Sequence, residues 1–152
     1  MARFIIVYNS TTGNTKAMAD AIKEGAESLN LVTDIINAFD VAIGDLLAAE
    51  AIGFGGPTMN YHPAKPLLKV LEELSHYDMK GKFAVSFGSY GWDGLGPVVI
   101  AEQLREMGFR VLDPVERVVY QPTDNELECL RHLGKDVAMA VKNIPHIKNL
   151  NV

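Results

Sequence analysis

Apolar runs that are typical of buried strands alternate with stretches of helical periodicity along the whole chain. The first run, residues 3–8, is nearly continuous, as expected for a strand buried on both faces of a parallel sheet. The pattern predicts strands over 3–8, 32–37, 51–55, 82–87 and a last strand over 109–120 broken at Asp113 and Pro114, helices over 15–29, 64–74, 97–107 and 123–141, and a short helix or turn over 40–49. Such alternation implies parallel strands joined by crossovers. We therefore expect an α/β fold, an open sheet with helices on both faces.

Local signals mark the ends of several predicted helices. Asn30 ends the first helix, and Gly108 caps the fourth. Thr123, with Glu126 three residues later, has the spacing of a capping box at the start of the last helix. Gly25 lies in the apolar stripe of the first helix, where we expect it to allow a close approach to the sheet.

Length and composition exclude several classes of protein. A chain of 152 residues with 48% apolar and 22% charged residues fits one globular domain. Its formal net charge of −5 argues against binding to a nucleic-acid backbone, which needs a basic face. A single cysteine excludes an intrachain disulfide, and no apolar run approaches the ~20 residues that span a bilayer. With no signal-peptide pattern at the start, a cytoplasmic location without membrane contact is expected.

The residues between the first strand and the first helix are suited to binding a phosphate. Ser10, Thr12 and Thr15 can each donate a hydrogen bond to an anionic oxygen, and Gly13 leaves room for a close backbone approach. The first N–H groups of a helix lack internal partners and lie at the positive end of its dipole. An ordinary N-cap would use the same residue types, so this loop alone leaves both interpretations open.

Three further loops lie at the same predicted edge of the sheet. Ligands of open parallel sheets bind at the carboxyl ends of the strands, where the strand order reverses. The loops at those ends are residues 10–15, 56–63, 88–96 and 121–125. The loop over residues 88–96 is rich in glycine and contains Tyr90 and Trp92, the only tryptophan of the chain.

The first three of these loops resemble loops of a known family. Ser10-Thr11-Thr12-Gly13-Asn14-Thr15 matches the flavodoxin phosphate-loop pattern Ser/Thr-x-Thr-Gly-x-Thr. Segments 55–60 and 87–92 resemble the second and third flavin loops of that family. Over nearly its whole length the chain is similar to the flavodoxin domain of flavodiiron proteins, the A-type flavoproteins. The resemblance implies a single flavodoxin-like domain over 1–152, a three-layer α/β/α sandwich whose five-stranded parallel sheet has the order 2-1-3-4-5, with FMN as the cofactor.

The resemblance also implies which residues contact FMN. The phosphate-loop contacts are Ser10, Thr11, Thr12, Gly13, Asn14 and Thr15, and the ring and ribityl contacts are Pro57, Thr58, Met59, Asn60, Ser89, Tyr90, Gly91, Trp92 and Gly94. The residue types agree, because Tyr90 and Trp92 offer aromatic faces to a planar ring and nearby glycines admit backbone N–H groups to its polar edge. No catalytic residue and no metal ligand are expected. Cys129 is predicted to be a structural thiol, and the histidines lack metal-ligand spacing.

Two features depart from the flavodiiron pattern. Those proteins carry a metallo-β-lactamase-like diiron domain ahead of the flavodoxin domain, whereas this sequence starts at the first strand. We therefore expect a standalone carrier without diiron chemistry. The fourth loop, Tyr120-Gln121-Pro122, lacks the Lys-Gly found there in that family, and its role is left open.

Three functions are compatible with these loops. The first is an FMN electron carrier that serves redox partner proteins, iron–sulfur or diiron proteins among them, alone or as a homodimer. The second is an NAD(P)H:quinone or flavin reductase, which needs room for a nicotinamide over the ring; the sequence has no insertion that would form it. The third is a receiver-type domain, which needs acidic residues after its first strand, where this chain has Tyr8, Asn9 and Ser10. We expect the carrier rather than an enzyme with its own substrate.

Overall fold

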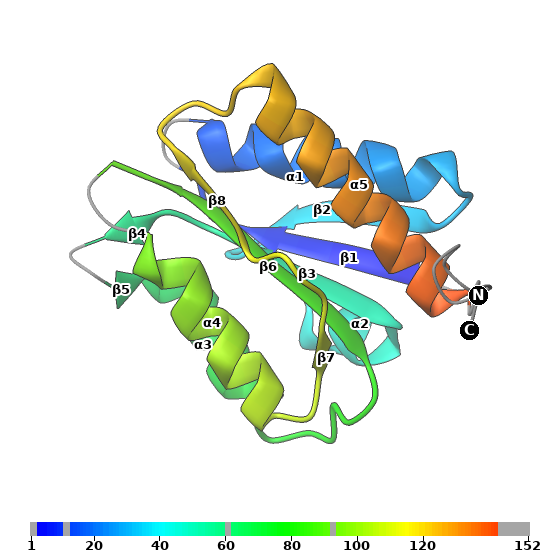
Figure 1. The fold of residues 1–152 in the computed structure, drawn as a ribbon. Coiled ribbons are helices and arrows are strands. Elements are labelled where there is room, and N and C mark those ends of the chain that lie inside the picture. Colours follow the sequence, from blue (N-terminus) through cyan, green and yellow to red (C-terminus); the bar gives the residue numbers. More distant parts are fainter. Residues whose placement is uncertain (1–2, 11–12, 60–61, 92–93, 143–152) are drawn as a thin grey trace.

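The computed structural model describes residues 3–10, 13–59, 62–91 and 94–142 and has the predicted alternation of strands and helices (Figure 1). In chain order the elements are β1 Arg3–Tyr8, α1 Asn14–Ser28, β2 Val32–Asn37, α2 Ile43–Ala48, β3 Ala51–Gly55, β4 Thr58–Met59, β5 His62–Pro63, α3 Lys65–Leu74, β6 Phe83–Tyr90, α4 Leu95–Glu106, β7 Arg110–Val111, β8 Glu116–Val119 and α5 Asp124–Val141. None of the helices in these ranges combines the length and apolar character needed to cross a membrane.

The main sheet is parallel, with the order β2-β1-β3-β6 and two short strands sharing the edge beyond β6. Of these, β7 pairs with the start of β6 and β8 with its end. The predicted order 2-1-3-4-5 is confirmed, and the fifth position is divided between two strands. The division falls where the sequence predicts it, around Asp113 and Pro114.

Helices cover both faces of this sheet and form two cores (Figure 1). Along β1 the side chains alternate, so Phe4 and Ile6 pack toward α1 and α5 while Ile5 and Val7 pack toward α2, α3 and α4. All four are fully buried, as predicted for a central parallel strand. The structure is therefore the expected α/β/α sandwich.

The prediction for Gly25 is wrong, because its close neighbour is a helix and not the sheet. A Cβ at Gly25 would collide with the backbone carbonyl of Arg131 in α5. In return, a Cβ at Gly134 of α5 would collide with the carbonyl of Ile22 in α1. The two glycines let the backbones of α1 and α5 cross closer than any side chain would allow.

Two local differences from the predicted elements lie near the carboxyl edge of the sheet. Strand β6 runs to Tyr90, three residues beyond the predicted end at Phe87, because β8 pairs with its residues 87–90. Within the predicted loop 56–63, Thr58 pairs with Pro63 in a two-stranded antiparallel hairpin, β4–β5. Both additions stiffen segments that the sequence assigns to loops.

Candidate functional site

The loops that follow β1, β3, β6 and β8 lie at one edge of the molecule and are joined by hydrogen bonds (Figure 1). After β1, the N–H of Asn9 donates to the carbonyl of Gly55 at 2.9 Å. After β3, the N–H of Gly56 donates to the carbonyl of Phe87 at 3.2 Å. These bonds continue the sheet ladders one residue past the strands, so the loops start from fixed positions.

The start of α1 has a backbone open to an anion. Its N-cap is Gly13, at φ +89°, and no described atom lies within 4 Å of where a Cβ would stand. The hydroxyl of Ser10 accepts a hydrogen bond from the N–H of Gly13 at 3.0 Å. No side-chain cap is formed there within the described residues, and the first turn has no acidic residue. The N–H groups of that turn are therefore available to donate hydrogen bonds to a ligand, at the positive end of the helix dipole.

Helix α5 shows the opposite arrangement at its start. Thr123 accepts a hydrogen bond from the N–H of Glu126, and the carboxylate of Glu126 accepts one from the N–H of Thr123 at 2.9 Å, which is the predicted capping box. Asp124 and Glu126 add negative charge to the first turn. This helix satisfies its own donors, so of these two helix starts only that of α1 is suited to an anion.

A buried hydrogen bond joins the first loop to the third. The hydroxyl oxygens of Thr15 and Ser89 lie 3.2 Å apart, and the two residues are only 1% and 7% exposed. One is in the first turn of α1 and the other near the end of β6, 74 positions apart. The sequence assigns these residues to different parts of the cofactor, and the structure places their hydroxyls in contact.

The second loop is held against the third by its own polar groups. The hydroxyl of Thr58 accepts a hydrogen bond from the N–H of Gly96 at 2.9 Å, in the first turn of α4. A Cβ at Gly88 would collide with the carbonyl of Gly56. Helix α4 begins at Leu95, two residues before the predicted start at Pro97. Glycines 88 and 96 are thus required by the packing of one loop on another, whatever binds beside them.

Most of the predicted site residues lie at this edge. Thr11, Thr12, Asn60 and Trp92 are outside the described residues. The remaining ones are Ser10, Gly13, Asn14, Thr15, Pro57, Thr58, Met59, Ser89, Tyr90, Gly91 and Gly94. Of these, Ser89 and Tyr90 are the last residues of β6 rather than loop residues, and Gly94 is the N-cap of α4.

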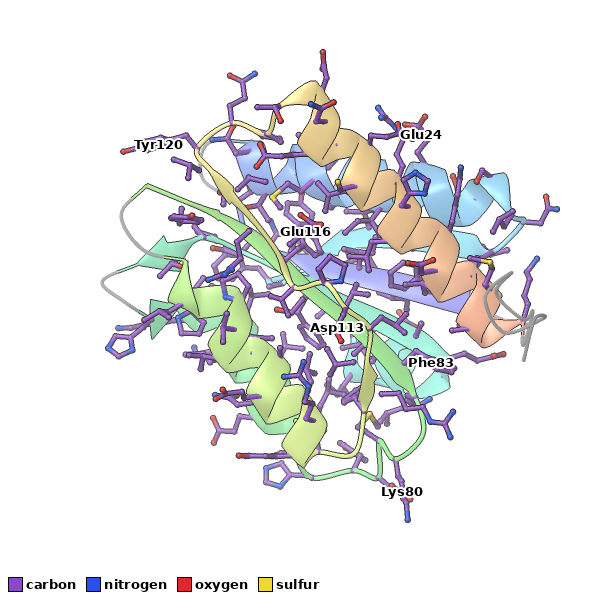
Figure 2. The ribbon with its side chains drawn as sticks, in the orientation of Figure 1. Glu24, Lys80, Phe83, Asp113, Glu116 and Tyr120 are labelled. Atoms are coloured by element: carbon purple, nitrogen blue, oxygen red, sulfur yellow. The ribbon has the colours of Figure 1, made fainter. Side chains whose placement is uncertain are left out.

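Two residues that the sequence analysis does not assign to the site lie beside the third loop. Tyr120 is 65% exposed at this edge, donates its N–H to the carbonyl of Tyr90 at 2.8 Å, and would clash with a Cβ at Gly91 (Figure 2). Arg117 donates to the carbonyl of Gly94 at 3.4 Å. Alternation along β8 could have indicated that Arg117 avoids the core, because it neighbours the buried Val118. It could not have indicated Tyr120, which has the parity of Val118 but follows the strand at φ +55°.

The ionisable groups near this edge offer little acid–base chemistry. Burial raises the pKa of the Glu116 carboxyl above its ordinary value, and the negative charge of Glu126 adds to the rise. Among the described residues there is no group of three or more histidine, cysteine, aspartate or glutamate side chains that could hold a metal ion. Cys129 is exposed and lies off the buried stripe of α5. The site offers backbone and hydroxyl donors together with aromatic rings.

The chain is similar to known proteins over most of its length. The model of the flavodoxin family matches residues 6–134. A putative diflavin flavoprotein A 3 from Synechocystis sp. is 31% identical over 143 residues, which are 90% of this chain and 24% of the relative. A coenzyme F420H(2) oxidase from Methanocaldococcus jannaschii is 31% identical over 148 residues, 92% of this chain and 35% of the relative.

These curated relatives are longer proteins, and the chain spans between 24% and 35% of their length. By contrast, a solved structure of a flavodoxin from the domain Archaea matches this chain over nearly the full length of both chains. It is 46% identical, superposes with a TM-score of 0.89, and the match covers 92% of this chain and 99% of that one.

Proposed function

The chain belongs to the flavodoxin family, and from that premise we propose that it binds FMN at the carboxyl edge of its sheet and carries electrons between redox partner proteins. Family membership confirms the fold and the cofactor class expected from the sequence. The assignment of individual residues to FMN, and the role of the whole protein, are our proposal.

The donors at the start of α1 fit the phosphate of FMN. The N–H groups of Asn14, Thr15 and Lys16 occupy the first helical turn, and the space above Gly13 is open. A terminal phosphate has enough oxygen atoms to accept hydrogen bonds from these groups and from the hydroxyl of Ser10. Thr11 and Thr12 join this group by their place in the motif.

The second and third loops fit the ring and the ribityl chain. Pro57, Thr58 and Met59 follow β3 on one side, and Ser89 and Tyr90 end β6 on the other. When bound, FMN supplies the reversible uptake and release of electrons. The protein orients the ring, excludes water from part of it, and offers the aromatic face of Tyr90 for stacking. Asn60, Gly91, Trp92 and Gly94 complete the proposed contacts.

The observation that carries this proposal is the contrast between two helix starts. Helix α5 caps itself fully, whereas α1 has no side-chain cap within the described residues and no acid in its first turn. Its buried Thr15 also links the phosphate position to the end of β6 through Ser89.

Cofactor selectivity tests the assignment. Isothermal calorimetry on protein stripped of flavin should show FMN binding, with riboflavin at least about a hundredfold weaker because it lacks the phosphate. FAD should bind poorly, because its phosphates are bridged to an adenosine and offer no terminal group to these donors. Equal affinities for the three flavins would contradict the phosphate site at α1.

A steady-state assay separates the carrier from a reductase of the same fold. We expect the FMN-loaded protein to show no appreciable NADH or NADPH oxidation with a quinone acceptor, and to accept electrons from a chemical reductant. Turnover with either nucleotide would favour the reductase instead.

Relatives in this family work with redox partners, which supports the coarser part of the proposal. We further propose that the partners include iron–sulfur or diiron proteins and that the protein acts in the cytoplasm, as a monomer or a homodimer. Sedimentation of the FMN-loaded protein over a range of concentrations distinguishes the two oligomeric states.

A further inference from the structure

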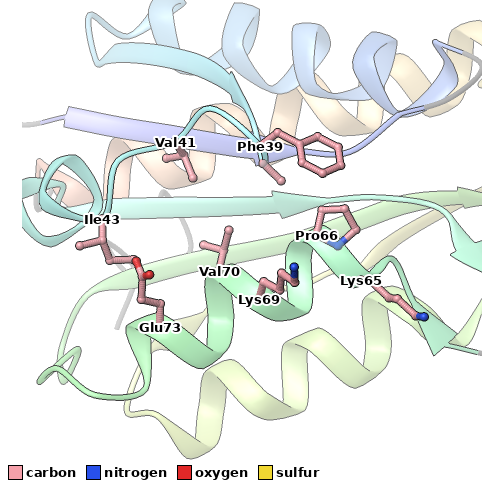
Figure 3. A pocket seen from close by; sticks show the side chains of 9 residues that line it. Phe39, Val41, Ile43, Lys65, Pro66, Lys69, Val70 and Glu73 are labelled. Atoms are coloured by element: carbon pink, nitrogen blue, oxygen red, sulfur yellow. The ribbon is translucent and has the colours of Figure 1, made fainter.

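A groove lies between the β2–α2 connection and α3, outside the loops assigned to FMN (Figure 3). It encloses a volume of about 400 Å³. Phe39 and Val41 form one wall, and Pro66 and Val70 face them from α3. Phe39 is 75% exposed, the largest exposed fraction of any large apolar residue in the described part of the chain. The groove is therefore an apolar surface that the described chain leaves uncovered.

Two lysines lie along the same groove in an unfavourable position. Lys65 and Lys69 are one turn apart on α3, where like charges repel each other. Lys65 is also the first residue of the helix, where the helix dipole disfavours a positive charge. Neither is in an ion pair with any described residue. Glu73, four residues after Lys69, offsets part of the repulsion at Lys69, so a bound anionic group would help Lys65 most.

The groove is connected to two of the loops assigned to FMN. At its β2 side, the N–H of Ala38 donates to the carbonyl of Tyr8 at 2.8 Å, at the end of the strand that leads into Ser10. At its α3 side, Lys65 follows the β4–β5 hairpin by two residues. Whatever occupies the groove therefore lies next to the first and second loops.

We propose that this groove docks an acidic segment of a partner protein. An apolar side chain of that segment fills the space between Phe39 and Val70, and its carboxylates pair with Lys65 and Lys69. Glu73 lies at the other end of the groove and repels carboxylates there, so the segment binds in one direction. The identification of the partner as an electron donor or acceptor rests on the proposed function, but the binding itself does not.

Charge complementarity decides between the candidate occupants. The chain as a whole carries a net charge of −5, whereas the charged residues that line the groove are Lys65, Lys69 and Glu73. An acidic segment is therefore repelled by most of the surface and attracted by the lysine end of the groove. A second copy of the chain could also present an acidic segment, and that alternative is an outcome of the test below.

The probe is an acetylated and amidated pentapeptide with a central phenylalanine flanked by two aspartates and two glutamates. Its control carries the corresponding amides in place of the acids. Amide chemical shifts of ¹⁵N-labelled protein are followed during titration with each peptide. We expect saturable shifts within residues 38–43 and 65–73 for the acidic peptide, weaker binding for the neutral one, and loss of the difference at high salt.

Matched variants identify the groups responsible. Lys65→Gln/Lys69→Gln should weaken binding of the acidic peptide roughly fivefold, and Phe39→Ser should weaken both peptides. Lys80→Gln/Lys135→Gln removes the same net charge elsewhere on the surface and should leave the affinity nearly unchanged. Equal weakening by the two double variants, or shifts confined to other surfaces, would overturn the proposal.

Self-association is checked on the same samples by sedimentation velocity. A dimer that dissociates in Phe39→Ser and in Lys65→Gln/Lys69→Gln would mean that a second copy occupies the groove, and the partner-segment proposal would then be wrong. Because the titration does not depend on flavin content, its failure leaves the FMN assignment intact, and poor FMN binding leaves the groove intact.

Discussion

Thr15 is the residue at which the two halves of the proposed site meet, because its buried hydroxyl contacts that of Ser89 at 3.2 Å. Thr15→Val keeps the shape of the side chain and removes the hydroxyl. We expect it to weaken FMN binding by about 1.5–3 kcal/mol, the range for hydrogen bonds to charged groups, and to leave riboflavin binding nearly unchanged. Calorimetry with both flavins measures the difference.

Thr33→Val is the matched control for that substitution. Thr33 lies on β2 and is also buried, but its hydroxyl donates to the carbonyl of Leu31, just before that strand and away from the loops. Thr33→Val should change the free energy of unfolding but not the ratio of the affinities for FMN and riboflavin. If Thr15→Val reduced the affinity for both flavins alike, its role would be structural rather than phosphate binding.

Glu116 gives a prediction about pH. Burial, and then the charge of Glu126, raise its pKa in the folded protein above the ordinary value of 4.5 (Figure 2). The folded state therefore holds this proton more tightly than the unfolded chain, and the free energy of unfolding falls as the pH rises through the interval between the two pKa values. Near neutral pH the ionised carboxylate is destabilising.

Glu116→Gln should accordingly raise the thermal midpoint near neutral pH, and its advantage should disappear at a pH well below 4.5. Thermal unfolding followed by circular dichroism at several pH values tests this. Glu102→Gln, at an exposed position of α4, should show no comparable change with pH. A gain for Glu116→Gln that is the same at all pH values would contradict the electrostatic explanation.

At the scale of elements, the crossing of α1 and α5 depends on two glycines. Gly25→Ala and Gly134→Ala would each drive a Cβ into a backbone carbonyl of the opposite helix. We expect each to lower the free energy of unfolding by about 1–3 kcal/mol or more, since neither backbone can move away cheaply. Urea denaturation measures the loss.

Gly44→Ala is the control for helix propensity. Gly44 lies in α2, and a Cβ there would meet nothing within 4 Å. Alanine favours a helix over glycine by up to about 1 kcal/mol, so this variant should be neutral or slightly more stable. If all three variants behaved alike, the helix crossing would not be the limiting contact.

At the scale of the whole molecule, the strands connect the two cores. Side chains of β1 point alternately into the two cores. Loss of either core would therefore leave β1 without packing on one face, and this would weaken the other core as well. We propose that residues 1–152 form a single domain that unfolds cooperatively. The charge distribution is also a whole-molecule property, since the basic groove stands out only against a net charge of −5.

Leu71→Ala, in the core under α3, and Ile22→Ala, in the core under α1, test this cooperativity. Both side chains are buried, and each truncation should cost about 2–5 kcal/mol. Each should shift one common transition, seen alike by circular dichroism and by amide signals from both faces of the sheet. Separate transitions for the two faces would contradict a single cooperative unit.

The sequence by itself determined the features that depend on neighbours a few residues away. Alternating apolar periodicities predict the parallel sheet and its helices, because each element needs one buried face. Asn30 and Gly108 end their helices at positive φ, and Thr123 with Glu126 forms the capping box, as their spacing predicts. The phosphate-loop motif is likewise contiguous, so it can be recognised without knowing what surrounds it.

The tertiary structure decided every feature in which distant segments meet. Strand β6 extends to Tyr90 only because β8 supplies hydrogen-bonding partners there. Gly25 faces a helix more than a hundred positions later, and Phe39 is left beside two lysines by the way α3 returns to the sheet. In each case the partner is set by how whole elements pack, and periodicity specifies which face of an element is buried but not which neighbour covers it.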